Sequence, residues 1–205
     1  MSKQFSRIDH LAFRVADRAA TVDWLVRALG YKIQKTDTGE DTFQIYFNDE
    51  KTETATCSAL EPPDTPPDDQ WHHLIPPILP SRIGNGNVKG GPVEFVLEYH
   101  RPAEIFVSEG TPGSIVHDWV QKRGGVGGLH HIAIQVPSVR DAMIEWRDKG
   151  LAEFTTDDPL QCPGLTQVFT KPSKLFGVVI EFIERGKYGF CATNVAALMQ
   201  STKGD

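Results

Sequence analysis

The chain has 205 residues, of which 40% are hydrophobic and 23% are charged, and its formal net charge is −6. These values exclude disordered and collagen-like classes and suit one compact domain or two tightly packed modules. The acidic balance argues against nucleic acid and anionic membranes as partners. No apolar run approaches a membrane span, and no signal-peptide core is found, so we expect a cytoplasmic protein.

The first predicted element is a strand at residues 8–15. Successive strand residues point to opposite faces, so His10 and Arg14 share one face while the other face is apolar and can pack on a helix. A helix is predicted from Asp17, a suitable N-cap, to Leu29. It ends at Gly30, which suits a left-handed C-cap.

The rest of the first half is mostly strand. Strands are expected at residues 31–35, 42–48, 54–60, 93–100 and 104–108. The segment 61–92 is rich in proline and glycine, and we interpret it as a long insertion without regular structure. A short helix at 113–122 leads into the second half.

The strand and helix of the first half recur in the second. The strand Gly-Gly-Leu-His-His-Ile-Ala-Ile-Gln-Val at 127–136 places His131 and Gln135 on one face, in register with His10 and Arg14. A helix at 138–149 follows and ends at Gly150. Further strands are expected at 152–155, 165–170 and 178–184, with a C-terminal helix at 191–200.

An internal repeat of this size determines the predicted fold class. We predict an α+β fold of two tandem βαβββ modules that form a curved, partly open barrel-like sheet around a metal site. The first module would span residues 1–112, including the insertion at 61–92. The second would span residues 113–205, including the C-terminal helix.

The predicted metal site combines both modules. Glu181 shares its strand face with apolar residues, and a buried carboxylate needs a partner or a metal. The first and last strands of a βαβββ unit can lie side by side, which would bring Glu181 to His131, and His10 comes from the equivalent strand. Two imidazoles and one carboxylate are the facial set of non-haem Fe(II) sites. We expect a divalent metal, with Fe(II) favoured over Co, Mn, Zn or Ni.

Two points of the site stay open. His130 is the rival of His131, although strict alternation turns it toward the helix side. Glu94 would overlay Glu181 if the strand at 93–100 closes the first module, and it is then a fourth ligand. Glu98 and Glu104 compete for that place if the register differs.

The three cysteines, Cys57, Cys162 and Cys191, are few, odd in number and scattered. Neither a disulfide framework nor a CxxC zinc site follows from this spacing. We therefore expect three passive thiols in a reducing compartment.

These residues resemble the vicinal oxygen chelate superfamily (glyoxalase/bleomycin resistance/dioxygenase), in which paired βαβββ modules surround a divalent metal. The segment Gln-Val-Phe-Thr-Lys-Pro at 167–172, the strand at 179–185 and the tail at 189–199 resemble the catalytic half of 4-hydroxyphenylpyruvate dioxygenase. In that family a His, a His and a Glu bind Fe(II), and by motif these fall on His10, His131 and Glu181.

Further site residues follow from the resemblance for Gln167, Phe169, Phe190 and Asn194, and from strand position in the repeat for Glu94, Gln135 and Arg14. We predict catalytic roles for Gln167 and Glu94, and substrate binding by Phe169, Phe190, Asn194, Gln135 and Arg14. Two positions depart from the family pattern. His130 replaces the usual glutamine before the second metal histidine, and Val195 replaces the usual aromatic residue in the tail.

The resemblance implies a dioxygenase that acts on a 2-oxo acid. A second branch, methylmalonyl-CoA epimerase, fits the Gly-Leu-His-His-Ile-Ala phrase and implies proton transfer assisted by a Lewis-acid metal. A glyoxalase-like isomerase or lyase and a non-catalytic small-ligand binder are the remaining alternatives. The expected partner is a small-molecule substrate, and a homodimer is a further expectation.

Overall fold

The computed structural model describes residues 7–63, 103–186 and 192–203. Its strands are β1 (Arg7–Val15), β2 (Lys32–Ile33), β3 (Phe43–Tyr46), β4 (Thr54–Glu61), β5 (Glu104–Gly110), β6 (Gly127–Gln135), β7 (Leu160–Cys162), β8 (Leu165–Phe169) and β9 (Val179–Arg185). Its helices are α1 (Arg18–Leu29), α3 (Ile115–Lys122), α4 (Val139–Asp148) and α5 (Ala192–Ser201). In these described ranges, no helix has the length and apolar character to cross a membrane.

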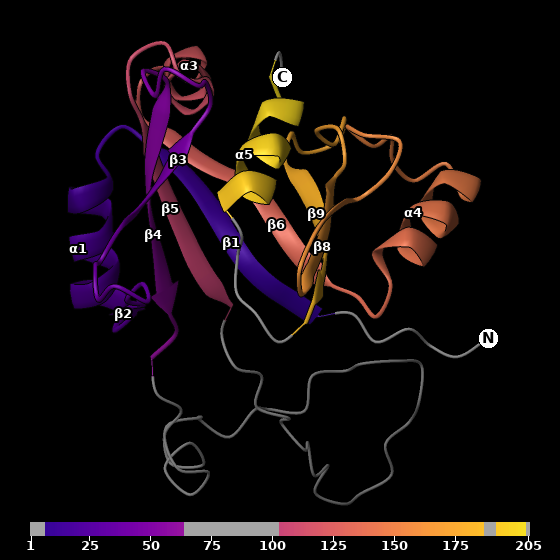
Figure 1. Ribbon diagram of the computed structural model, residues 1–205, viewed down its shortest axis with the longest axis horizontal. Coiled ribbons are helices and arrows are strands. Elements are labelled where there is room, and N and C mark those ends of the chain that lie inside the picture. The colour runs from indigo at the N-terminus through magenta and orange to yellow at the C-terminus, as the bar shows by residue number, and fades with distance from the viewer. Residues whose placement is uncertain (1–6, 64–102, 187–191, 204–205) are drawn as a thin grey trace, which may run out of the picture.

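All nine strands belong to one curved sheet, in the order β2-β4-β5-β1-β6-β9-β8-β7, with β3 paired to β4 (Figure 1). The central strands β1 and β6 run antiparallel. Each pairs on its other side, in parallel, with the last strand of its own half: β1 with β5, and β6 with β9. The two halves therefore repeat one arrangement, which confirms the predicted α+β fold of two tandem βαβββ modules.

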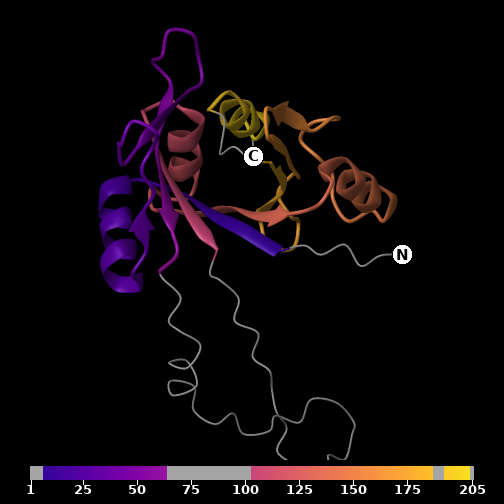
Figure 2. The ribbon, with the colours of Figure 1, turned by 60° about the horizontal axis from the view of Figure 1, so that its bottom comes forward.

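Helices α1 and α4 cover the convex side of the sheet, one in each half (Figures 1 and 2). The predicted N-caps are present, because the side chain of Asp17 accepts a hydrogen bond from the Ala20 amide and that of Ser138 from the Asp141 amide. Gly30 is the predicted left-handed C-cap, with φ of 74°. Each helix lies over its own apolar core, so each half buries its own hydrophobic surface.

Helix α5 lies on the concave side of the sheet, between its two arms (Figures 1 and 2). It contacts β3 in the first half and β7 and β8 in the second. Leu198, 2% exposed, packs with Phe169 and Val179. The C-terminal helix thus covers a space that the two modules form together.

Some local expectations differ from the structure. The segment 152–155 makes only an isolated bridge between Phe154 and Thr170, and no pattern in the sequence indicated the short strand β7. The strand predicted at 93–100 lies outside the described residues. In the first module, β5 takes the place beside β1 that β9 takes beside β6.

The expectation of three passive thiols is wrong for Cys162, which forms a disulfide. Cys57 is a free, buried thiol, and Cys191 lies outside the described residues. Sequence spacing did not reveal this bond because a disulfide depends on proximity in the fold. The cysteine pattern therefore no longer argues for a reducing compartment.

The close contact between β1 and β6 requires glycine at position 127. Gly127 has φ of +87°, and a Cβ there would lie 2.1 Å from the backbone oxygen of Arg14. We expect Gly127→Ala to lower the free energy of unfolding, measured by urea denaturation, at least about 2 kcal/mol more than Gly125→Ala. Gly125 is the matched control, since its φ of +82° is similar but nothing lies within 4 Å of the place that a Cβ would take there. Equal losses would contradict the steric argument.

Candidate metal centre

Three neighbouring strands bring the predicted ligands together. His10 lies on β1, His131 on β6 and Glu181 on β9. In the register of the sheet, Ala133 of β6 is the partner of both His10 and Glu181. Its methyl group is small and fully buried, which leaves space for the larger side chains on either side. Glu181 thus meets histidines from both modules, as the spacing predicted.

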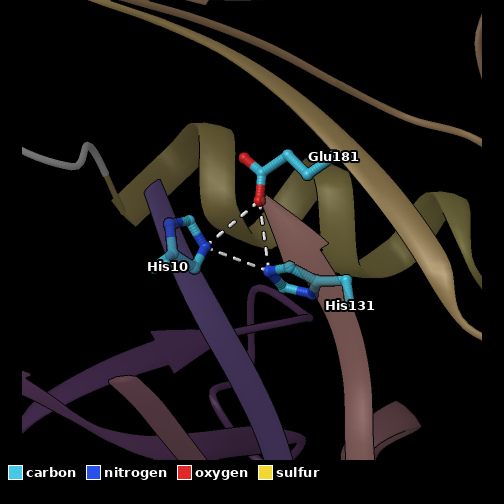
Figure 3. Close-up of side chains that lie close together, drawn as sticks. All are labelled: His10, His131 and Glu181. Carbon is cyan, nitrogen blue, oxygen red and sulfur yellow. Dashed lines mark hydrogen bonds and ion pairs between the residues drawn. The ribbon is translucent and has the colours of Figure 1, made fainter. Parts of the chain in front are cut away.

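The three side chains converge with their donor atoms close together (Figure 3). Glu181 Oε2 lies 3.3 Å from His10 Nε2 and 3.1 Å from His131 Nε2, and the two Nε2 atoms are 3.1 Å apart. With ligand bonds of about 2.1 Å, donors are about 3.0 Å apart at right angles and about 3.4 Å apart in a tetrahedron. The donor set therefore fits a single divalent ion.

Neighbouring side chains fix the orientation of these candidate ligands. Asp9 Oδ1 lies 2.8 Å from His10 Nδ1, and Arg185 donates to both carboxylate oxygens of Asp9, each at 2.6 Å. Gln167 donates from Nε2 to Glu181 Oε1 at 2.6 Å, so Oε2 is the oxygen directed at the histidines. Such outer contacts raise ligand basicity and hold the ligand geometry.

The protonation of the site follows from burial and these contacts. Burial disfavours ionised Glu181, but hydrogen bonds and charge interactions with His10 and His131 outweigh it and lower the pKa of Glu181 to about 2. Burial also disfavours protonated His10, yet its bonds to Asp9 and Glu181 raise the pKa of His10 to about 9. For His131 burial dominates and lowers the pKa. At neutral pH His10 in the metal-free site is thus protonated, and its positive charge balances Glu181 as a bound metal ion would.

The repeat predicts where a fourth ligand from the first module would stand. Ala133 pairs with Glu181 in the second module, and the equivalent residue Ala12 pairs with Phe106 in the first. Phe106 therefore occupies the counterpart position of Glu181, and its ring lies 4.9 Å from that of His10. Glu104 is bonded to Arg185 instead, with Oε2 at 3.5 Å. Within the described residues the site has three candidate ligands.

The expectation that His130 faces the helix side is wrong. The register between β1 and β6 shifts at this point, because Ala12 pairs with His131 but Phe13 pairs with Leu129. His130 is the extra residue of a bulge, which turns its ring into the concave side. It is 3% exposed, and its Nδ1 lies 2.9 Å from His131 Nδ1. Burial, with the nearby Arg14 charge, holds the pKa of His130 well below its usual value.

A cavity opens beside the three candidate ligands, between the two arms of the sheet and under α5. Its polar lining consists of His10, Arg14, Cys57, Ser108, His130, His131, Gln167 and Glu181. Its apolar lining includes Phe43, Phe106, Phe169, Val195, Leu198 and Met199. A mostly apolar cleft with a few convergent polar groups is the usual form of a small-molecule site.

Residues 7–182 match the Glyoxalase/Bleomycin resistance protein/Dioxygenase superfamily. The chain belongs to this superfamily. The sequence resemblance is thereby confirmed at the level of the superfamily, which consists mostly of metal-dependent enzymes. A comparison with curated proteins found no match.

Solved structures show how widely this fold is shared. The chain is 14% identical to a mutant of 4-hydroxymandelate synthase from Streptomyces coelicolor, with a TM-score of 0.64, covering 97% of this chain and 53% of that one. It is 16% identical to methylmalonyl-CoA epimerase from Mycobacterium tuberculosis, with a TM-score of 0.52 and 87% of each chain covered. A hypothetical protein from Bacillus halodurans C-125 is 20% identical, with a TM-score of 0.54 and coverage of 91% and 99%. These likenesses show the fold alone.

In this superfamily member the structure brings together some predicted site residues and leaves others apart. Arg14, Gln167 and Phe169 line the cavity with the three candidate ligands. Asn194 is buried on α5 and Gln135 is half-buried on β6, but neither lines the cavity. Phe190 and Glu94 lie outside the described residues, so their roles stay predictions.

Sequence reasoning missed several residues that complete the site. Asp9 and Phe106 contact His10, and Cys57 lines the cavity. Burial raises the pKa of the Cys57 thiol to about 12, so this cysteine stays protonated. The repeat contained a usable signal for Cys57, because it is the counterpart of Gln167: Cys57 pairs with Ser108, and Gln167 with Ile183.

Removing the Glu181 charge should abolish tight metal binding. We expect Glu181→Gln to weaken Co(II) or Fe(II) affinity at least about 100-fold, because the amide keeps the volume but supplies no anionic oxygen. Metal titration followed by calorimetry measures this. Glu153→Gln is the control, since Glu153 is exposed and pairs with Lys171. Unchanged affinity in Glu181→Gln would remove this carboxylate from the ligand set.

Metal binding should release the proton held by His10. The pKa of His10 is raised from 6.5 to about 9, so its contribution to the stability of the metal-free protein is complete below pH 6.5 and is lost as pH rises through 9. Metal affinity should rise with pH over the same interval, since the cation replaces the proton. Calorimetry at pH 7 in buffers of different ionisation enthalpy should detect release of about one proton. Affinity that falls with rising pH would contradict this assignment.

Proposed function

We propose that the chain is an Fe(II)-dependent dioxygenase that acts on a 2-oxo acid. The proposal is carried by the number of candidate ligands, which is three among the described residues, where Phe106 occupies the position from which the first module would supply a fourth. A six-coordinate ion then keeps three positions for other ligands. A 2-oxo acid that binds through two oxygens, together with dioxygen, requires three such positions.

The side chains around the cavity have separable roles in this proposal. Fe(II), when bound, supplies the activation of dioxygen and the oxidative decarboxylation of the 2-oxo acid. Gln167 holds Glu181 Oε1, which keeps Oε2 directed at the metal position. The rings of Phe106 and Phe169 lie 4.9 and 4.8 Å from those of His10 and His131, and they exclude water from the imidazoles.

We further propose that Arg14, Gln167 and Phe169 contact the substrate. Arg14 is a cation with 2% exposure that lines the cavity, and a guanidinium suits recognition of an anionic group. Gln167 Oε1 is buried and, within the described residues, has no hydrogen-bond partner. Its orientation is set by the bond from Nε2 to Glu181, so Oε1 is an acceptor available to a donor on the substrate.

The epimerase alternative requires a pair of groups that exchange a proton with the substrate carbon. Apart from the three candidate ligands, the titratable residues in the described lining of the cavity are Arg14, Cys57 and His130. Arginine stays protonated, and burial raises the pKa of Cys57 to about 12. His130 alone then has the character of a base, and this count favours the dioxygenase proposal.

The decisive experiment is oxygen consumption by protein reconstituted with Fe(II) under anaerobic conditions. Addition of air and a panel of aromatic and aliphatic 2-oxo acids should give oxygen uptake and carbon dioxide release in a ratio of one to one. Metal analysis of the same sample establishes that the site is loaded. No uptake by loaded protein, with deuterium exchange from solvent into an acyl thioester under Co(II) or Mn(II), would instead support an epimerase. Ligand affinity without either reaction would support a binder.

The proposed role of Gln167 has its own test. We expect Gln167→Leu to weaken Fe(II) affinity about 10- to 100-fold, because Glu181 Oε1 loses its buried donor while the side-chain volume is kept. Gln161→Leu is the matched control, since Gln161 is an exposed residue of β7. Equilibrium metal competition measures both variants. Equal affinities would show that Gln167 does not support Glu181.

A further inference from the structure

Each central strand of the sheet has a bulge immediately before its metal-site histidine. In the pairing of β1 with β6, the register shifts between Ile8 and His10 and again between Ala12 and Phe13. The first shift leaves Asp9 without a paired residue on the neighbouring strand, and the second leaves His130 without one. A bulge re-aims a side chain that regular alternation would turn away.

Both bulged residues contact the outer nitrogen of the histidine that follows them. Asp9 Oδ1 lies 2.8 Å from His10 Nδ1, and His130 Nδ1 lies 2.9 Å from His131 Nδ1. The inner Nε2 atoms face Glu181, and a nitrogen that binds a metal must present a lone pair. In the metal-loaded protein, the proton of each ligand histidine is therefore on Nδ1.

This geometry fixes the tautomer of His130 as well. His131 Nδ1–H donates, so His130 Nδ1 accepts and the proton of neutral His130 is on Nε2. The ring lines the cavity, with Trp119 and Phe169 packed edge-on at centroid distances of 5.5 and 5.9 Å. Within the part of the chain that is described, no protein group accepts a hydrogen bond from His130 Nε2.

The two bulged residues therefore differ in the groups that they contact on the side away from the ligand histidine. On the side of His10, the contacts continue from Asp9 to Arg185 and Glu104, and none of these three residues lines the cavity. On the side of His131, they end in an N–H group of a cavity-lining ring. Of the two bulged residues, His130 lines the described part of the cavity and Asp9 does not, so His130 is placed to extend a chain of hydrogen bonds from His131 to a bound molecule.

We propose that His130 fixes the tautomer of His131 and donates its Nε2–H to an acceptor oxygen of the metal-bound substrate, such as the carboxylate oxygen that does not bind the metal. The inference rests on the proposed function for the presence of the metal. It assigns His130 two roles, a positioning role toward His131 and a substrate contact, and each has a separate readout.

The positioning role is tested by NMR of the Co(II)-loaded protein. Wild type should show two strongly shifted exchangeable N–H signals, one for each ligand histidine. In His130→Phe one of them should exchange with solvent at least about 10-fold faster, because the ring keeps its bulk but loses the acceptor. His130→Gln should retain both signals, since its amide can accept and donate. His117→Phe, on a partly exposed histidine of α3, is the matched control.

The substrate contact is tested with pyruvate, added without oxygen and followed by the Co(II) absorption spectrum. His130→Phe should weaken pyruvate binding about 10-fold, and His130→Gln should stay within about threefold of wild type. If pyruvate affinity is unchanged in His130→Phe, the donor role is overturned. If both N–H signals are unchanged as well, His130 only fills space.

A measurement on the unaltered protein covers the case in which His130→Phe does not fold. In Zn(II)-loaded protein labelled with ¹⁵N-histidine, His130 should be the Nε2–H tautomer and His131 the Nδ1–H tautomer. Any other tautomer of His130 overturns the inference and leaves the proposed function intact. Failure of the wild type to bind Co(II) or Zn(II) would overturn both.

Discussion

The buried carboxylate of Glu181 is the constraint on which the centre of this structure depends. Glu181 is 1% exposed, and an uncompensated charge at that depth would be very costly. Compensation comes from His10, His131 and Gln167, on three other strands. The strands β1, β6, β8 and β9 must therefore keep a fixed pairing register. Ala133 and Gly127 on the central strand β6 permit this register, because larger side chains there would crowd the neighbouring strand β1.

The duplicated fold supplies equivalent positions, and the chemistry comes from the places where equivalent residues differ. His10 and His131 are the same residue type at equivalent positions of the two modules. At two other pairs of equivalent positions the residues differ: the first module has Phe106 where the second has Glu181, and Cys57 where the second has Gln167. The first module thus contributes one candidate ligand and an apolar wall, and the second contributes two candidate ligands and their support. This asymmetry leaves one side of the metal position open to the cavity.

The strongest local signals of the sequence were reliable. Caps and glycines located α1 and α4, because a helix end depends on residues within one turn of it. Strand alternation with a repeated histidine indicated His10, His131 and Glu181, and these three do converge. The disulfide of Cys162 and the position of His130 were missed, because each depends on a neighbour that is remote in sequence or on an irregularity in strand pairing.

The sequence by itself determined the type and order of most elements, the tandem repeat and the three candidate ligands, since periodicity and register are local properties that recur in both halves. Only the tertiary structure decided that Phe106 occupies the position from which the first module would supply a fourth ligand. It also decided that bulges turn Asp9 and His130 toward the histidines that follow them, and that α5 covers a cavity between the modules. Those features arise where strands and a helix that are distant in the sequence meet in the fold. The residue pattern of one strand alone does not determine which residues of the neighbouring strand it pairs with.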